Sequence, residues 1–173
     1  MTYAVVYSSR TGNTRAVAQA VAASLPGCLL LPVEDSAAAL ACDVLFVGGW
    51  IDRGTFDEKT RAFLEALSGK RVALFLTLGA YPFSKHALET QLKVWNLAAE
   101  QNEVLGCFAC QGKLSPVLHD KFKSLPPGHP HALTPQRLQR YEEAAGRPNP
   151  ADLQNAMDYA RTIAQRVAPY AAG

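Results

Sequence analysis

The chain has 173 residues, 49% of them apolar, and a formal net charge of +2 from 17 Lys and Arg against 15 Asp and Glu. These proportions of apolar and charged residues are typical of a globular protein, and the length suits a single domain over residues 1–173. The charge is too small to favour nucleic acid as a partner, and no apolar run approaches the ~20 residues that cross a bilayer. Because no basic segment followed by an apolar one opens the chain, we expect no signal peptide and a cytoplasmic protein.

Short apolar runs alternate with stretches of helical periodicity. The runs predicted as strands cover residues 3–7, 28–33, 43–49, 71–77 and 103–110. The helices predicted between and after them cover residues 14–25, 56–67, 84–101 and 152–167, the third of them capped by Ser84. Continuous apolar runs are typical of strands covered on both faces, and strands separated by helices form parallel sheets. The sequence therefore predicts an α/β fold with a doubly wound, five-stranded parallel sheet.

Residues 111–149 interrupt this alternation of strands and helices, between the fifth strand and the last helix. They contain six of the 11 prolines and three of the four histidines. Thr134 followed by Pro135 indicates the start of a further helix that extends to about residue 145. A connection of this length is usually functional or mobile. We interpret it as a Pro-rich insertion within the single domain.

Cys107 and Cys110 have the C-x-x-C spacing of redox and metal sites. They lie in an apolar run that reads as a strand, where positions three apart point to opposite faces. No second pair of cysteines and no nearby group of histidines completes a zinc site. We therefore predict structural, buried thiols and no metal.

A hydroxyl-rich loop follows the first strand and leads into the first helix. Backbone N–H groups at a helix N-terminus carry a partial positive charge that suits a phosphate. The loop lacks the lysine of a P-loop and the glycine spacing of a dinucleotide-binding loop. The alternative is an ordinary polar turn with Asn13 or Thr14 as the helix cap. The residues predicted to hold phosphate are Ser8, Ser9, Arg10, Thr11, Gly12, Asn13 and Thr14.

This loop resembles the FMN-phosphate signature of the flavodoxin family, Ser/Thr-x-Thr-Gly-x-Thr, which residues 9–14 match at every fixed position. The resemblance covers about residues 1–110 and the last helix. It implies FMN as the cofactor and a three-layer α/β/α fold with strand order 2-1-3-4-5. In that order the ligand binds at the switch point between strands one and three.

The resemblance also implies two further loops beside the flavin ring. In the first, Trp50 is expected to offer the ring an aromatic face, or else to anchor the loop to the domain. In the second, Tyr81 is expected to stack on the ring, or else to face solvent or the insertion. The implied cofactor-binding residues are Gly49, Trp50, Ile51, Asp52, Arg53 and Gly54 in the first loop, and Leu78, Gly79, Ala80 and Tyr81 in the second.

The function that the resemblance implies is electron transfer from FMN to a partner reductase, with no catalytic side chain of the protein itself. A second hypothesis is an FMN-dependent oxidoreductase of the quinone or protoporphyrinogen type, acting directly on a small substrate. Its candidate proton donors are His86, His119, His129 and His131. A third hypothesis is an assembly module that has lost FMN, which the intact phosphate loop disfavours.

Residues 48–52, residues 107–113 and the Pro-rich tail also resemble bacterial flavodoxin-like proteins that accompany a bilirubin reductase. That likeness implies a supply of electrons to tetrapyrrole reduction. Ordinary flavodoxins are acidic, whereas this chain carries a net positive charge. We therefore expect a specialised redox partner protein, recognised by different electrostatic steering.

Overall fold

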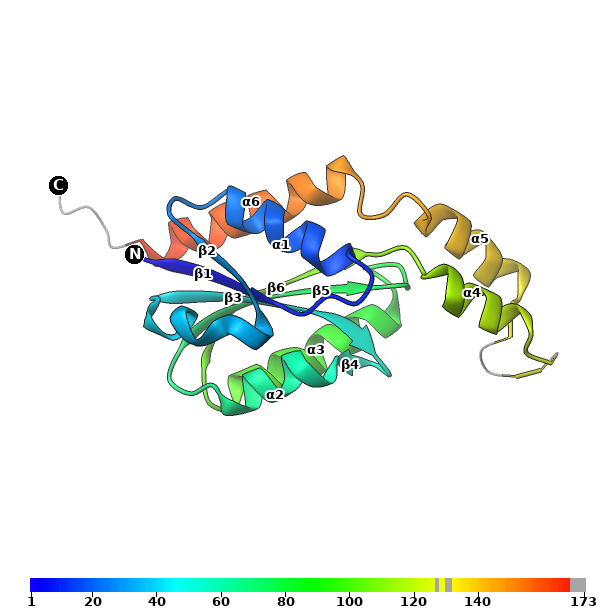
Figure 1. The fold of residues 1–173 in the computed structure, drawn as a ribbon, viewed down its shortest axis with the longest axis horizontal. Helices are drawn as coiled ribbons and strands as arrows, with labels where there is room; N and C mark the ends of the chain where they lie inside the picture. Colours follow the sequence, from blue (N-terminus) through cyan, green and yellow to red (C-terminus); the bar gives the residue numbers. More distant parts are fainter. Residues whose placement is uncertain (127, 130–131, 169–173) are drawn as a thin grey trace.

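A computed structural model describes residues 1–126, 128–129 and 132–168. Five parallel strands form a central sheet in the order β2-β1-β3-β5-β6, with a short sixth strand, β4, paired to β3 (Figure 1). The order confirms the predicted 2-1-3-4-5 arrangement of the five main strands. Their bounds are β1 (Tyr3–Tyr7), β2 (Leu29–Pro32), β3 (Val44–Asp52), β5 (Arg71–Leu78) and β6 (Glu103–Gln111).

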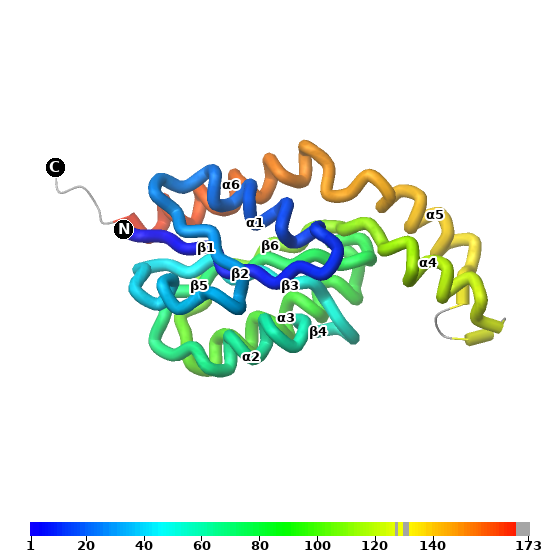
Figure 2. Tube along the Cα trace, viewed as in Figure 1, coloured from blue at the N-terminus to red at the C-terminus, as the bar shows by residue number. Residues whose placement is uncertain are grey.

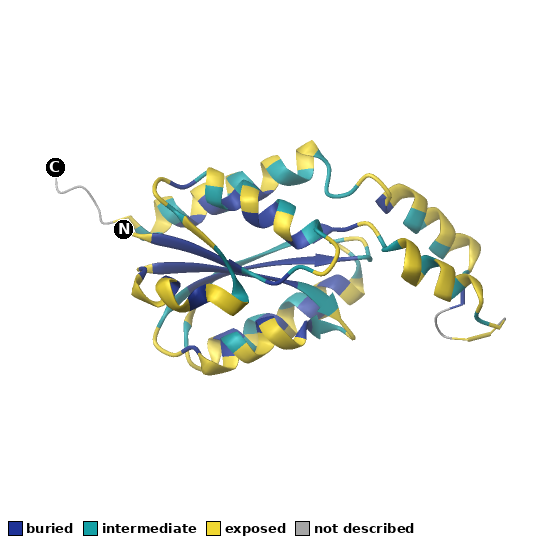
Figure 3. Ribbon diagram, viewed as in Figure 1, coloured by how far each residue is buried: buried dark blue, intermediate teal, exposed yellow. Residues whose placement is uncertain are grey.

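Helices cover both faces of the sheet, as the tube in Figure 2 also shows. One face carries α1 (Asn13–Ala23) and α6 (Pro150–Val167), which pack on one apolar cluster around Phe46 and Phe75. The other face carries the 3-10 helix η1 (Val33–Ala41), α2 (Glu58–Ala66) and α3 (Lys85–Ala99), which pack on a second cluster. The inner strands β1, β3 and β5 are the most buried part of the sheet (Figure 3), whereas the edge strand β2 is exposed to half-buried. Burial on both faces explains the continuous apolar runs of the inner strands.

Side-chain caps set the start of several helices. Asp57 accepts a hydrogen bond from the Thr60 N–H at the start of α2, and Ser84 accepts one from the Ala87 N–H at the start of α3. Asn149 and Asp152 form a reciprocal capping box at the start of α6. Each cap satisfies N–H groups that have no partner within the helix.

A hairpin that the sequence analysis missed joins β3 to β4 (Thr55–Phe56). Its two turn residues, Arg53 and Gly54, have φ values of 50° and 78°. Two positive φ values are typical of the tight turns that fit the twist of a hairpin. An Arg-Gly pair is not the usual signal for such a turn, so this hairpin is hard to predict from the sequence.

The predicted insertion contains two helices, α4 (Pro116–Lys123) and α5 (Pro135–Ala144). The cap of α5 at Thr134 was predicted, whereas α4 was not. We call residues 112–149 the α4–α5 arm, since α4 and α5 lie beyond the end of the sheet at which β6 finishes (Figure 1). Inside the arm the rings of Phe122 and Tyr141 stack with their centroids 6.3 Å apart.

Candidate functional site

The β1–α1 loop presents the N-terminus of α1 at the carboxyl edge of the sheet. The Ser8 N–H donates to the Gly48 carbonyl oxygen at 3.0 Å, which continues the pairing of β1 with β3. Gly12 is the N-cap residue and has a φ of 91°, in the left-handed region that favours glycine. It offers no side chain to the first turn, where Ser9 Oγ accepts from the Arg15 N–H at 3.2 Å. The loop therefore fits an anion, because backbone N–H groups and hydroxyls meet at the positive end of a helix.

Two predicted phosphate ligands have other tasks in this structure. Thr14 is buried, and its hydroxyl lies 2.8 Å from the hydroxyl of Thr77 on β5. Asn13 Nδ2 donates to the Lys113 carbonyl oxygen at 2.9 Å and to Thr11 Oγ1 at 3.3 Å. Thr14 thus fixes α1 to the sheet, and Asn13 fixes the loop to the base of the arm.

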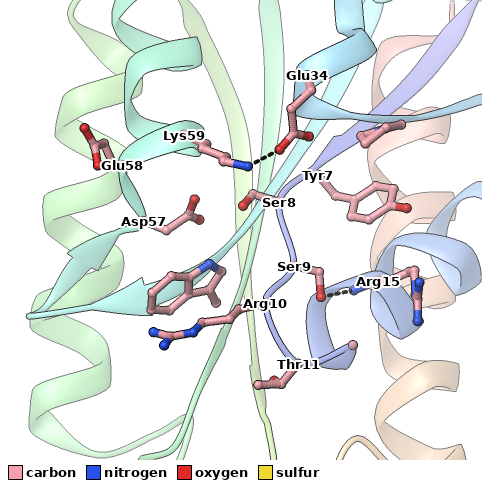
Figure 4. Close-up of a pocket in the computed structure, with 13 residues that line it drawn as sticks. Tyr7, Ser8, Ser9, Arg10, Thr11, Arg15, Glu34, Asp57, Glu58 and Lys59 are labelled. Atoms are coloured by element: carbon pink, nitrogen blue, oxygen red, sulfur yellow. Dashed lines mark hydrogen bonds and ion pairs between the residues drawn. The ribbon is translucent and has the colours of Figure 1, made fainter.

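A cleft of about 720 Å³ opens beside the loop (Figure 4). Trp50 lines it, and the Arg10 guanidinium lies 5.6 Å from the centroid of the Trp50 ring. That distance suits a cation–π contact, which orients both side chains. The structure therefore brings together five predicted loop residues and Trp50. The lining residues are Tyr7, Ser8, Ser9, Arg10, Thr11, Gly12, Arg15, Pro32, Glu34, Trp50, Asp57, Glu58 and Lys59.

Charged side chains on the far side of the cleft were not predicted. Lys59 Nζ donates to Glu34 Oε1, and this ion pair joins α2 to η1 across the cleft (Figure 4). The bond lowers the pKa of Glu34 and raises that of Lys59, because it favours both charged forms. Pro32 is the last residue of β2, and Asp57 directly follows β4, which pairs antiparallel with β3. The sequence contained a signal for Pro32, because parallel strands end at one edge of the sheet and their last residues meet there.

The first predicted ring loop is only partly at the cleft. Asp52, Arg53 and Gly54 form the β3–β4 turn, and a Cβ at Gly54 would lie 3.8 Å from the His86 ring on α3. Gly49 has a packing reason for lacking a side chain, because a Cβ there would lie 2.6 Å from Phe56. Ile51 pairs with Phe56 in the hairpin. The role of these residues in binding a ring stays a prediction.

The second predicted ring loop, Leu78 to Tyr81, does not line the cleft. Leu78 is buried, and space is open around Gly79, where an added Cβ would meet nothing within 4 Å. The Tyr81 hydroxyl donates to Glu143 Oε2 at 2.5 Å, which joins the loop to α5 and raises the pKa of Tyr81. Tyr81 thus contacts the insertion and is also exposed to solvent, and its stacking on a flavin ring stays a prediction.

The other candidate side chains do not gather at the cleft. His86 lies on α3 and His119 on α4, His129 lies in the arm, and His131 is outside the described residues. Within the described part of the chain no group of three or more His, Cys, Asp or Glu could hold a metal ion. There, too, no helix combines the length and apolar character needed to cross a bilayer.

Cys107 and Cys110 belong to the apolar clusters on opposite faces of the sheet, as their spacing on a strand predicted. Burial raises the pKa of each thiol to about 12. Because the thiolate is the reactive form, both groups are poorly suited to redox chemistry near neutral pH.

The fold and the β1–α1 loop define a doubly wound α/β protein whose sheet presents a loop suited to an anion at its switch point. The family model of the flavodoxin domain matches residues 4–161, so the chain belongs to this family. It is a flavodoxin-type protein, as the sequence predicted, and this membership supports FMN as its cofactor.

Relatives and solved structures agree with this assignment. The chain is 29% identical over 167 residues to the flavodoxin-like domain-containing protein BilS of Clostridioides difficile strain CD3, covering 92% of this chain and 94% of BilS. It is 27% identical to BilS of Clostridium symbiosum strain WAL-14163, covering 88% and 90%. Oxidised flavodoxin 1 from Bacillus cereus superposes with a TM-score of 0.60 at 16% identity, covering 97% of this chain and 100% of the other. A flavoprotein from Lactobacillus acidophilus NCFM in complex with FMN has a TM-score of 0.50 at 14% identity, covering 62% and 91%.

Proposed function

We propose that the chain binds FMN and delivers electrons to a partner reductase. The observation that carries this proposal is the β1–α1 loop beside an open cleft, where the N-cap residue Gly12 makes no side-chain cap and Ser9 Oγ accepts from the Arg15 N–H in the first turn of α1. A dianionic phosphate complements the partial positive charge at such a terminus. Family membership over residues 4–161 supports FMN as the molecule that carries the phosphate.

In this function the protein binds, orients and tunes the cofactor. The backbone N–H groups of residues 10–14 and the hydroxyls of Ser9 and Thr11 hold the phosphate. Bound FMN supplies one-electron and two-electron chemistry. Trp50 and Arg10, in contact with each other at the cleft, provide an aromatic face and a positive charge beside it. The Arg10 charge favours an anionic group nearby. The partner protein approaches the carboxyl edge of the sheet through a small, transient interface.

The acceptor to test first is a tetrapyrrole reductase. The resemblance to flavodoxin-like proteins that accompany bilirubin reductase points to such an acceptor, and the chain is similar to BilS over most of both lengths. Reduction of a tetrapyrrole would then occur on the partner, so this chain needs no proton donor of its own.

One contact favours the alternative, an FMN-dependent oxidoreductase that acts directly on a small substrate. The bond from Tyr81 to Glu143 holds the arm beside the second predicted ring loop. In that position the arm would form one side of a substrate pocket. Steady oxidation of NADH or reduction of a quinone by the purified protein alone would favour this alternative over the carrier.

The visible spectrum of the purified protein with added FMN tests the proposal. We expect the flavin bands to shift and sharpen and the flavin fluorescence to change on binding. The reduced complex should then transfer electrons to the acceptor protein faster than free reduced FMN does. A colourless protein that leaves the FMN spectrum unchanged would contradict the proposal and favour an assembly module.

A further inference from the structure

The formal charge of the chain is unevenly divided between the α4–α5 arm and the rest. Residues 112–149 contain six Lys and Arg and three Asp and Glu, which gives a formal charge of +3. The remaining residues contain 11 Lys and Arg and 12 Asp and Glu, which gives −1. The net positive charge of the chain therefore resides in the arm.

Some of the arm's charged groups are engaged, but two lysines are not. Glu143 accepts hydrogen bonds from Tyr81 and from Gln139 within α5. Arg147 pairs with Asp152 of α6 at 2.6 Å. Lys121 and Lys123 lie in the last turn of α4, are exposed, and form no ion pair among the residues that the structure describes. Their charges are available to a partner.

The surfaces of α4 and of the β5–α3 loop, which Tyr81 joins to the arm, have the composition of an interface. None of the α4 residues is buried, and the Val117 side chain is 81% exposed. Phe83, two residues after Tyr81, is 90% exposed. Large apolar side chains with polar groups at their rim are typical of surfaces that bind another protein.

The base of the arm is joined to the candidate site. Asn13 of the β1–α1 loop donates to the Lys113 carbonyl oxygen, and the Lys113 N–H donates to the Arg147 carbonyl oxygen at 3.2 Å. Tyr81 joins the opposite side of the arm to the β5–α3 loop. A protein seated on the arm therefore lies at the same edge of the sheet as the cleft (Figure 1).

From these observations we propose that the arm docks an acidic face of the protein that exchanges electrons with this chain. The proposal rests on the proposed function and names the chemistry of the partner. The arm raises the encounter rate through its charge and brings the partner to the cleft edge. Charge of this kind acts mainly on association and weakens with ionic strength.

The test uses a charge reversal on the arm and a matched reversal elsewhere. The arm variant is Lys121→Glu/Lys123→Glu. The control is Arg161→Glu/Arg166→Glu on α6, which makes the same change in net charge toward the opposite end of the molecule (Figure 1). Cytochrome b5 serves as an acidic acceptor and cytochrome c as a basic one. The measured quantity is the second-order rate constant for their reduction by the reduced, FMN-loaded protein. Circular dichroism confirms that both variants are folded.

We expect the arm variant to reduce cytochrome b5 about tenfold more slowly at low salt, with the loss shrinking as salt is added. The control should change this rate by less than about twofold, and the arm variant should not slow cytochrome c. Equal effects of the two variants on cytochrome b5, or an equal loss with cytochrome c, would overturn the proposal.

A second readout separates this proposal from the function on which it rests. In the flavin-free, 15N-labelled protein, added cytochrome b5 should shift the amide signals of α4 more than those of α2. If FMN does not bind but these shifts occur, the proposed function fails and the arm remains a docking surface. If FMN binds but the shifts spare α4, the docking surface is wrong. If a short DNA duplex shifts the α4 signals and cytochrome b5 does not, the arm binds nucleic acid and the proposed acidic protein partner is wrong.

Discussion

The helical and sheet layers and the α4–α5 arm are held in place by different forces. In the layers, side chains such as Phe46, Leu74 and Phe75 are completely buried between strands and helices. The arm has no buried residue in α4 and is attached by a few hydrogen bonds, among them the one from Tyr81 to Glu143. Apolar burial fixes the layers, which carry the candidate site, whereas the arm is attached through a few polar contacts, one of them to Asn13 of the β1–α1 loop.

The largest expected contrast comes from adding one methyl group to a glycine. In Gly48→Ala the new Cβ would lie 1.9 Å from the Phe75 ring in the middle of the sheet. We expect the free energy of unfolding to fall by about 3 kcal/mol, because a packed core cannot absorb the overlap. The matched change at the base of the arm is Gly146→Ala, where a Cβ meets nothing within 4 Å. There we expect a change below about 0.5 kcal/mol. Urea unfolding measures the free energy of unfolding of both variants. Similar losses of stability in the two would contradict the difference between the layers and the arm.

The next largest effect concerns the anion site itself. Thr11→Ala/Gly12→Val removes a hydroxyl and places a branched side chain where φ is 91°. We expect the dissociation constant for FMN to rise more than tenfold, which is a loss of more than about 1.4 kcal/mol of binding free energy. Fluorescence titration measures it.

Gly69→Val is the control for backbone strain in this experiment, since Gly69 also has a positive φ, 66°, and lies in open space outside the cleft. It should leave FMN affinity unchanged. Equal losses of affinity in the two variants would mean that the loop acts through stability alone.

A smaller effect is expected from Tyr81→Phe, which removes only the hydroxyl that binds Glu143. A neutral hydrogen-bond donor to an exposed carboxylate stabilises a fold only weakly, because water screens and competes for both groups. Hydrogen exchange should therefore accelerate in α5 while the amides of β3 and β5 keep their protection. Acceleration throughout the sheet would show that the arm and the layers unfold together.

The same contact predicts a pH dependence. The bond from Tyr81 lowers the pKa of Glu143, so its stabilising effect is present above the ordinary pKa of a glutamate and is lost as the pH falls through the lowered value. The bond also raises the pKa of Tyr81, so the contact persists to alkaline pH and is lost only above that raised value. An NMR titration of the Glu143 carboxyl carbon should show its pKa rising in Tyr81→Phe. An unchanged value would place the two side chains apart in solution.

The strands and helices of the layers could be predicted from the sequence because each has a regular pattern of apolar residues along the chain. Runs such as residues 44–47 are apolar at every position, which strands covered on both faces require. The loop at residues 8–14 was found because hydroxyls and a glycine stand between a strand and a helix. In contrast, α4 carries no buried stripe, so no periodicity reveals it.

The contacts of the site that sequence reasoning did not reveal depend on distant partners. Thr14 is predicted to bind phosphate, and the structure adds a contact between its hydroxyl and that of Thr77, which is 63 positions away. Gly49 was expected to make room for a ligand, but it also makes room for Phe56 across the hairpin. The Glu34–Lys59 ion pair joins two helices that meet only after folding. A single sequence does not reveal such pairings, because they arise from packing between elements.

The measurement that tests the central claim most directly is a paired calorimetric titration of the protein with FMN and with riboflavin. The two ligands share the ring and the ribityl chain and differ only in the phosphate. If the β1–α1 loop holds the phosphate, FMN should bind more than tenfold more tightly, a difference above about 1.4 kcal/mol. Equal affinities for the two flavins, or no binding of either, would contradict the account.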